Sequence, residues 1–261
     1  MNVLILNTSP KKKGGASRCF SRILKSMLWG CKVKVYDVCN QSHYAKGLEL
    51  LEEADAVVIS SPLYVDGIPA HMLPFLQQAE DLCKKKKYNF KLYVLSNNGF
   101  VEGIQNKLHL KMYEAWCQHA GVEWGGGLGI GGGVLISVVM IVLPITIIMG
   151  GFGLVKLMIE TGAITMQDIW EIYKGSLIIL FLLMGFFVCE FIMAYNIRKG
   201  NKGQNLYTRP LMPSFIFLIV SDIFMILSAM TKGKLPHKLF KQVTLEEAHT
   251  CMLGDNAEKS R

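Results

Sequence analysis

Clustered cysteines are missing from this sequence, which argues against two common classes of site, the CxxC redox pair and the cysteine metal site. The seven cysteines show neither a CxxC pair nor the spacing of metal ligands. An odd, scattered set is typical of reduced thiols in the cytoplasm, with a disulfide framework as the less favoured alternative. Four histidines likewise form no catalytic triad or metal set by spacing, so we expect no metal site. These histidines are His43, His71, His109 and His119.

Charge is also scarce, and its distribution is uneven. Charged residues make up 18% of the chain and hydrophobic residues 51%, which is too apolar for an average soluble protein. No charged residue occurs from Trp124 to Val155. The net charge of +8 comes without the dense alternation of basic and aromatic residues typical of nucleic-acid-binding proteins, so we expect no nucleic-acid partner. A mildly basic protein is attracted to an anionic lipid surface.

The first half of the chain alternates short apolar runs with helical patterns. Met1–Leu6 runs directly into a strand, so we expect no signal peptide. Repeated strand–helix units predict an α/β fold, with a five-stranded parallel sheet and helices on both faces. The predicted strands are 2–6, 32–38, 56–59, 91–96 and 122 onward, and the predicted helices are 17–28, 48–51, 69–82 and 104–120.

The loop after the first predicted strand lacks both standard nucleotide motifs. Neither GxGxxG nor GxxxxGK[ST] is present, so neither a dinucleotide-binding loop nor a P-loop is supported. Residues 7–18 nevertheless combine hydroxyls, lysines and Gly14-Gly15 at the start of a helix. Backbone N–H groups and the helix dipole at such a place can hold a phosphate. The alternative is a surface turn with solvated lysines.

Two further loops follow the third and fourth predicted strands. In residues 60–67, Tyr64 is placed to cover a flat heterocycle or to pack locally. In residues 96–103, Gly99 and Gly103 permit close approach to a ligand, although a turn without a ligand would use similar residues. All three loops fall at the carboxyl ends of parallel strands, where ligands of such sheets bind.

Together these loops resemble those of the flavodoxin-like NAD(P)H-dependent FMN oxidoreductases, over about residues 1–131. The resemblance implies FMN as cofactor and NAD(P)H as co-substrate, with no catalytic side chain because the flavin carries the chemistry. The family often ends its phosphate loop in Asn-Thr, where this chain has Ala16-Ser17-Arg18. By resemblance, the phosphate contacts are Ser9, Lys11, Ser17 and Arg18, and the ring contacts are Pro62, Leu63, Tyr64, Val65, Asn97, Asn98, Gly99 and Phe100.

The second half contains three long apolar runs. Val134–Leu157 is long enough to span a bilayer, or else supplies the last helix of the α/β domain. Gly175–Ile197 and Leu211–Thr231 are predicted spans, with an apolar dimer interface as the alternative. The predicted organisation is a flavodoxin-like FMN-binding domain (1–133), an apolar helical region with two or three transmembrane helices (134–235) and a polar tail (236–261).

The orientation of these spans stays open. Arg198, Lys199, Lys202 and Arg209 favour a cytoplasmic flavin domain at the cell membrane, whereas the lysines after residue 231 argue against three spans. Glu190 and Asp222 are the only charges inside the second and third runs. They predict an ion or proton path, or else a Glu190 near a cytoplasmic interface and an Asp222 bonded to Ser221, Ser228 or a neighbouring backbone group.

The sequence therefore predicts a membrane-attached FMN-dependent NAD(P)H oxidoreductase that passes electrons to a small-molecule acceptor such as a quinone, with the lipid bilayer as its other partner. One alternative is a flavodoxin-type electron carrier that docks a protein partner. Another is a non-catalytic membrane protein with a degenerate flavin site. A homodimer is one option for the oligomeric state.

Overall fold

The computed structural model describes residues 1–10, 15–230 and 233. The chain divides into two compact units, Met1–Leu211 and Met212–Arg261. The first unit thus continues well past the predicted domain boundary at residue 133. Lys11, the lysines after residue 231 and the predicted tail 236–261 lie outside the described residues.

A six-stranded parallel sheet forms the centre of the first unit, in the order β2-β1-β3-β4-β5-β6. The order of the first five strands is the flavodoxin-like one. The central strand β3 is buried along its whole length, as its continuous apolar run predicts. The strands are β1 (Asn2–Asn7), β2 (Lys32–Asp37), β3 (Ala56–Pro62), β4 (Lys91–Asn97), β5 (Glu123–Ile130) and β6 (Leu206–Thr208).

The sixth strand corrects the prediction of five. β6 has only three residues and pairs with the carboxyl half of β5, from Leu128 opposite Leu206 to Ile130 opposite Thr208. All three of its residues are half-buried, so no apolar run marks it in the sequence. Its pairing partner lies more than seventy residues earlier, which local patterns do not reveal.

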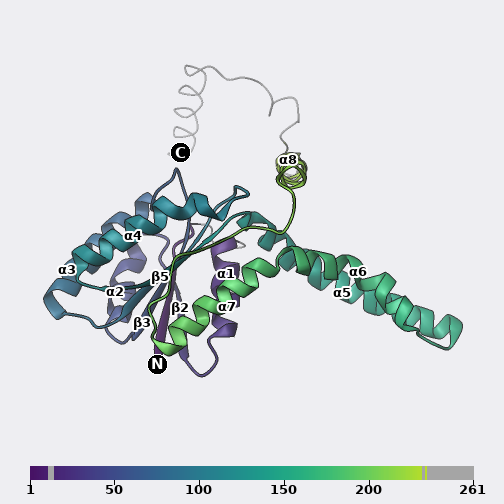
Figure 1. Ribbon diagram of the computed structural model, residues 1–261, viewed down its shortest axis with the longest axis horizontal. Helices are drawn as coiled ribbons and strands as arrows, with labels where there is room; N and C mark the ends of the chain where they lie inside the picture. Colours follow the sequence, from purple (N-terminus) through teal and green to yellow (C-terminus); the bar gives the residue numbers. More distant parts are fainter. Residues whose placement is uncertain (11–14, 231–232, 234–261) are drawn as a thin grey trace, which may run out of the picture. The chain divides into compact units, whose positions relative to one another are not determined.

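Helices cover both faces of the sheet (Figure 1). Alternate strand residues point to opposite sides: Leu4 joins the core beneath α2, α3 and α4, whereas Ile5 joins the core beneath α1 and α7. The helices of this unit are α1 (Ala16–Met27), α2 (Tyr44–Leu51), α3 (Leu73–Lys86), α4 (Lys107–Ala120), α5 (Gly133–Thr161), α6 (Met166–Leu182) and α7 (Met184–Lys199), with short 3-10 turns η1 (Gln41–His43), η2 (Ala70–Met72) and η3 (Gly103–Asn106).

The helical layer after β5 is split between two segments of the chain. The start of α5 packs on the core, where Ile136 is 1% and Val139 is 9% exposed. The chain then leaves the domain as a hairpin of α5 and α6 and returns as α7 (Figure 1). α7 packs against α1 and β5. The reading of Val134–Leu157 as the last helix of the α/β domain therefore holds for its beginning, whereas its remainder leaves the sheet and the membrane span stays a prediction.

The continuous span predicted over Gly175–Ile197 is corrected by this arrangement. The run consists of α6 and α7, which are bent by 53° relative to each other on either side of Leu183. α7 buries Phe186, Glu190 and Ile197 within the domain. Apolar composition alone does not distinguish a helix covered by protein from one covered by lipid.

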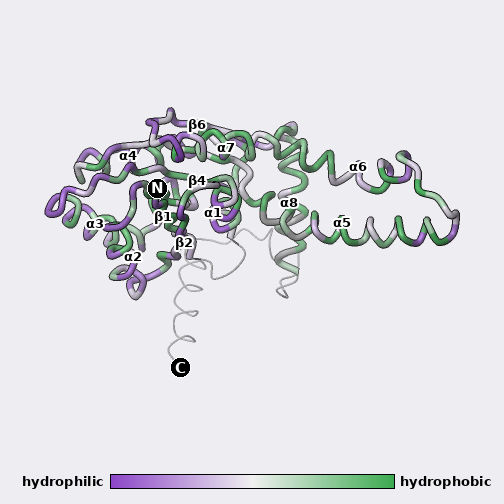
Figure 2. Tube along the Cα trace, turned by 90° about the horizontal axis from the view of Figure 1, so that it is seen from below, coloured by the Kyte–Doolittle hydropathy of each residue, from purple (hydrophilic) through white to green (hydrophobic). Residues whose placement is uncertain are grey.

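The α5–α6 hairpin is apolar along most of α5 (Figure 2). Its segment Val142–Thr161 has 20 residues and a mean hydropathy of 2.1. Among the described residues, it is the one unbroken helical segment that is long and apolar enough to cross a membrane, by length and composition alone. The second unit contains α8 (Ser214–Met230), a shorter apolar helix that covers most of the third predicted run.

Candidate functional site

The three predicted loops meet in one cavity of about 230 Å³ at the carboxyl ends of β1, β3 and β4. They converge because parallel strands end at the same edge of a sheet. Of the predicted site residues, eight line this cavity, and three lining residues were not predicted. The predicted ones are Ser9, Ser17, Pro62, Leu63, Tyr64, Asn97, Asn98 and Gly99; the others are Gly15, Ala16 and Val134.

The remaining predicted residues have other positions. Val65 and Phe100 are exposed beside the cavity and do not line it. Lys11 lies outside the described residues. Gly15 and Ala16 belong to the same glycine-containing loop as Ser17, so that loop could have indicated them. Val134 belongs to the apolar run, and no signal in the sequence connects it with the cavity.

The start of α1 forms the polar end of the cavity. Gly15 is its N-cap and has no side chain, so the amides of Ala16 and Ser17 in the first turn have no intrahelical acceptor. The first turn contains no acidic residue. Free amides and the positive end of the helix dipole together favour an anion at this place.

The Ser17 side chain is oriented by its neighbours. Its Oγ accepts a hydrogen bond from Asn97 Nδ2 at 2.8 Å, and Ser17 is 1% exposed. The Ser17 carbonyl accepts from Ser60 Oγ at 2.9 Å. Because the Ser17 hydroxyl oxygen already accepts a bond, its proton is available for an oxygen of a bound anion.

Arg18 forms an ion pair with Asp37. Its guanidinium donates to the Asp37 carboxylate at 2.7 Å, and that carboxylate also accepts from Asn7 Nδ2 at 2.7 Å. Asp37 ends β2, so the pair joins the start of α1 to the sheet edge. The carboxylate engages only one of the three guanidinium nitrogens, and Arg18 Nε is buried without a hydrogen-bond partner, so the role of Arg18 at the phosphate stays a prediction.

The second loop turns tightly at Val65 and Asp66. Both have positive φ, 47° and 56°, and Gly67 N donates to the Tyr64 carbonyl at 3.1 Å. Two central residues with positive φ define a type I′ turn, which asparagine and glycine favour and a β-branched residue resists. Strain of this kind clusters at functional sites. The turn holds Tyr64 at the rim of the cavity, 42% exposed.

The third loop is fixed by Asn98. Its Oδ1 accepts from Phe100 N at 3.1 Å, and its Nδ2 donates to the Glu102 carbonyl at 3.2 Å. Gly103 serves a purpose other than the predicted ligand approach: an added Cβ would lie 2.2 Å from the Thr208 carbonyl oxygen. The glycine therefore allows the loop to pack against β6. Of the two glycines predicted to approach a ligand, only Gly99 lines the cavity.

A buried polar cluster supports this loop from below. Asn106 Nδ2 donates to the Gly103 carbonyl, so its Oδ1 faces Ser96 and accepts the Ser96 hydroxyl proton at 2.7 Å. Ser96 Oγ also lies 2.6 Å from His109 Nδ1. Since the serine proton is used, His109 Nδ1 is the donor. Burial lowers the pKa of His109 to about 4.

The residues of the cavity fit an extended phosphate-bearing ligand with a flat ring, such as FMN. The α1 amides and the Ser17 hydroxyl supply donors at one end, and no carboxylate lines the described walls. Tyr64, Asn98 and Gly99 also line the cavity, and Asn97 lies between them and Ser17. An aromatic face and backbone polar groups suit a planar heterocycle.

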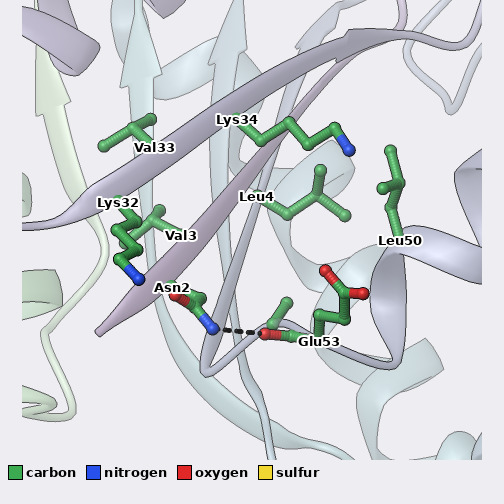
Figure 3. Close-up of a pocket in the computed structure, with 9 residues that line it drawn as sticks. Asn2, Val3, Leu4, Lys32, Val33, Lys34, Leu50 and Glu53 are labelled. Atoms are coloured by element: carbon green, nitrogen blue, oxygen red, sulfur yellow. Dashed lines mark hydrogen bonds between the residues drawn. The ribbon is translucent and has the colours of Figure 1, made fainter.

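A larger cavity, of about 450 Å³, lies at the opposite end of the sheet (Figure 3). Asn2 and Lys32, the first residues of β1 and β2, line it together with Lys34, Leu50 and Glu53. Asn2 Nδ2 donates to the Glu53 carbonyl at 3.0 Å. This cavity is less suited to the proposed ligand, because it has no loop or helix start that presents backbone donors, and because sheets of this kind bind ligands at their carboxyl ends.

No family model matches the chain, and no curated protein matches it. Among solved structures, it is similar to an NAD(P)H:quinone oxidoreductase from Methanothermobacter marburgensis, with 18% identity, 51% of this chain and 84% of that chain covered, and a TM-score of 0.43. It is also similar to the Trp repressor binding protein from Bacillus subtilis, with 13% identity, coverage of 50% and 84%, and a TM-score of 0.41. Likeness at this level is too low to assign a function, which depends on the cavity itself.

Proposed function

We propose that this protein is an FMN-dependent NAD(P)H oxidoreductase attached to the membrane, which passes electrons to a small acceptor such as a quinone. The observation that carries this proposal is the single cavity shared by the three loops, with unpaired α1 amides at one end and Tyr64 at the other. When bound, FMN supplies the hydride and electron chemistry. The chain holds the phosphate and positions the ring.

Ser17 and Asn97 have the main positioning role. Asn97 holds the Ser17 hydroxyl so that its proton faces the anion, and it also joins the phosphate end to the ring end of the cavity. A second bond, from Asn97 Nδ2 to the Ser61 carbonyl at 3.3 Å, connects the end of β3, just before the second loop. One side chain therefore coordinates all three loops.

An absorption spectrum tests the cofactor. Detergent-extracted protein, with and without added FMN, should show flavin bands and oxidise NADH or NADPH. In the variant Ser17→Ala we expect FMN affinity to fall about tenfold, because one hydrogen bond to a charged group is lost. Ser26→Ala is the control, because Ser26 lies on the same helix, is exposed and bonds only the Ile23 carbonyl. Protein that stays colourless with added FMN would contradict the proposal.

A flavodoxin-type electron carrier is the second candidate. It is favoured by the exposure of Val65 and Phe100 beside the cavity, at 102% and 59%, because exposed apolar side chains near a redox centre suit a docking partner. FMN-loaded protein that oxidises neither nicotinamide would support the carrier over the enzyme.

Membrane attachment is supported by the exposed apolar surface of the hairpin. Soluble monomers rarely expose large continuous apolar patches. The basic residues Arg198, Lys199 and Arg209 lie in the domain unit, at the ends of α7 and β6, which favours a cytoplasmic flavin domain.

Cell fractionation tests the attachment. The protein should remain in the membrane fraction after washing with high salt, because apolar burial does not depend on ionic strength as surface charge attraction does. Release by salt alone would indicate a basic surface that adheres to lipid headgroups. Recovery in the soluble fraction without any wash would contradict attachment.

A further inference from the structure

The apolar hairpin begins at the wall of the candidate flavin cavity. Val134, the second residue of α5, lines that cavity. The chain just before it is bonded to the third loop, since Gly133 N donates to the Asn98 carbonyl at 2.8 Å and Gly132 N donates to the Phe100 carbonyl. The same helix therefore touches the site and continues into the exposed hairpin.

Between the domain and Val155, the surface of α5 is apolar on every side. No charged residue occurs from Val134 to Val155. Ile145, Ile147, Ile148 and Phe152 are 55%, 51%, 58% and 69% exposed, although these positions point in different directions around the helix. A helix that meets a second protein copy needs one apolar face and keeps a polar one. Apolar residues all round instead match contact with lipid.

The few polar groups in this part of the hairpin are satisfied inside it. Thr146 Oγ1 lies 3.0 Å from Ser176 Oγ and bonds the Leu143 carbonyl at 2.9 Å. Tyr173 OH donates to the Ile147 carbonyl at 3.3 Å. Internal pairing is what a hydrocarbon environment requires, because lipid offers no hydrogen-bond partner. The charged side chains gather toward the far end of the hairpin: Lys156, Glu160, Asp168, Glu171 and Lys174.

The lipid-contacting helix and the cavity thus share Val134. At the same rim, Tyr64 lines the cavity with an exposed ring, and Val65 and Phe100 stand exposed beside it. An acceptor dissolved in the bilayer would meet apolar side chains from the hydrocarbon to the cavity. A water-soluble acceptor would enter the cavity from solvent, and its route would not involve the exposed apolar hairpin.

We propose that the electron acceptor is a lipid-soluble quinone, which reaches the cavity from the bilayer along the first turns of α5. This inference rests on the proposed oxidoreductase function. In each turnover NAD(P)H gives up a hydride, and one further proton comes from water. The quinone gains the two electrons and two protons, so that both carbonyl π bonds break and two O–H bonds form.

The test uses full-length protein in phosphatidylcholine and phosphatidylglycerol vesicles that contain a long-chain ubiquinone, assayed without oxygen for NAD(P)H oxidation. Menadione, a short quinone with measurable water solubility, is the comparison acceptor. With the long-chain quinone, the rate per protein molecule should follow the mole fraction of quinone in the lipid. This rate per protein should stay constant when the whole vesicle suspension is diluted at fixed protein-to-lipid ratio and fixed NAD(P)H concentration.

A charged residue on the hairpin should slow the reduction of only the quinone that comes from the bilayer. In Ile148→Glu we expect long-chain quinone reduction to fall at least about tenfold, since a charged residue in the hydrocarbon costs several kcal/mol. FMN content and the menadione rate should be unchanged, which also shows that the variant folds. Leu108→Glu is the control, because Leu108 on α4 is 57% exposed, close to the 58% of Ile148.

Three outcomes separate the two proposals. If the parent protein reduces menadione but not the long-chain quinone, the bilayer route is wrong and the oxidoreductase function stands. Equal long-chain rates for the parent and Ile148→Glu would also overturn the route. If FMN is bound and neither quinone is reduced, the oxidoreductase function itself fails.

Discussion

Asn97 Nδ2 donates a hydrogen bond of 2.8 Å to Ser17 Oγ, across eighty residues of sequence. The bond joins the end of β4 to the first turn of α1, and both residues are buried. It links the phosphate end of the candidate site to the loop that borders the ring. The cavity therefore depends on the sheet order, which brings β1 and β4 to either side of β3.

Replacement of Asn97 should weaken FMN binding without unfolding the domain. In Asn97→Ala the Ser17 hydroxyl loses its orienting donor, so we expect FMN affinity to fall about tenfold, the equivalent of about 1.4 kcal/mol. Quenching of flavin fluorescence measures the affinity. Asn89→Ala, at an exposed position, should leave it unchanged. Equal affinities for the two variants would show that the bond plays no part in binding.

Val65 should be a site where substitution stabilises the fold. Its φ of 47° is unfavourable for a β-branched residue, and its side chain is fully exposed, so it makes no compensating packing contact. Val65→Asn should raise the free energy of unfolding by about 1 kcal/mol, because asparagine tolerates this conformation. Urea denaturation measures the change. A less stable Val65→Asn, with Val65→Ala close to the parent, would mean that the turn is not left-handed at this position.

Glu190 should make the protein less stable as the pH rises. Both of its carboxyl oxygens are buried without a hydrogen-bond partner, and burial raises the pKa of Glu190 well above its usual 4.5. The folded state therefore keeps a proton that the unfolded state releases. The free energy of unfolding should fall above pH 4.5, by up to about 1.4 kcal/mol per pH unit until the folded-state pKa is reached.

The variant Glu190→Gln should lack this slope and be more stable than the parent protein at pH 8. Glu53→Gln is the matched control, because Glu53 is exposed at the surface. Denaturation curves across pH 4 to 8 measure the difference between each variant and the parent. A parallel pH profile for Glu190→Gln and the parent would show that the carboxyl is not buried in solution.

His109 should produce the opposite dependence in acid. Burial lowers its pKa from 6.5 to about 4, so the unfolded state takes up a proton first as the pH falls. The stability present above pH 6.5 should decline by about 3 kcal/mol down to pH 4. His109→Gln should remove this loss, and His119→Gln, exposed on the same helix, should keep it. An unchanged acid profile in His109→Gln would contradict the neutral, buried imidazole.

The positions of the first five strands, and the edge of the sheet where the loops gather, were accessible from the sequence. Apolar runs such as Ala56–Ile59 are local signals, and repeated strand–helix units imply that the strands run parallel. Parallel strands end at one edge, so the loops after β1, β3 and β4 had to meet. Eight of the predicted residues line the cavity for this reason.

The roles of individual side chains were less accessible. Arg18 had two candidate acceptors, a ligand phosphate and a carboxylate elsewhere in the chain, and only the folded structure places Asp37 within 2.7 Å. Gly103 was predicted to open space for a ligand, whereas it opens space for the backbone of Thr208. Both depend on contacts with residues that are distant in the sequence.

The sequence by itself determined the positions of the first five strands, the three loops and the presence of long apolar helices, because each follows from patterns within a few residues. The order of the strands in the sheet depends on contacts between distant segments, which only the structure shows. Only the tertiary structure decided how the apolar half is used. The runs at Val134–Leu157 and Gly175–Ile197 have similar composition, yet the start of α5 and all of α7 pack on the sheet, while the rest of α5 projects from it. Hydropathy measures transfer out of water and does not record whether protein or lipid replaces the water.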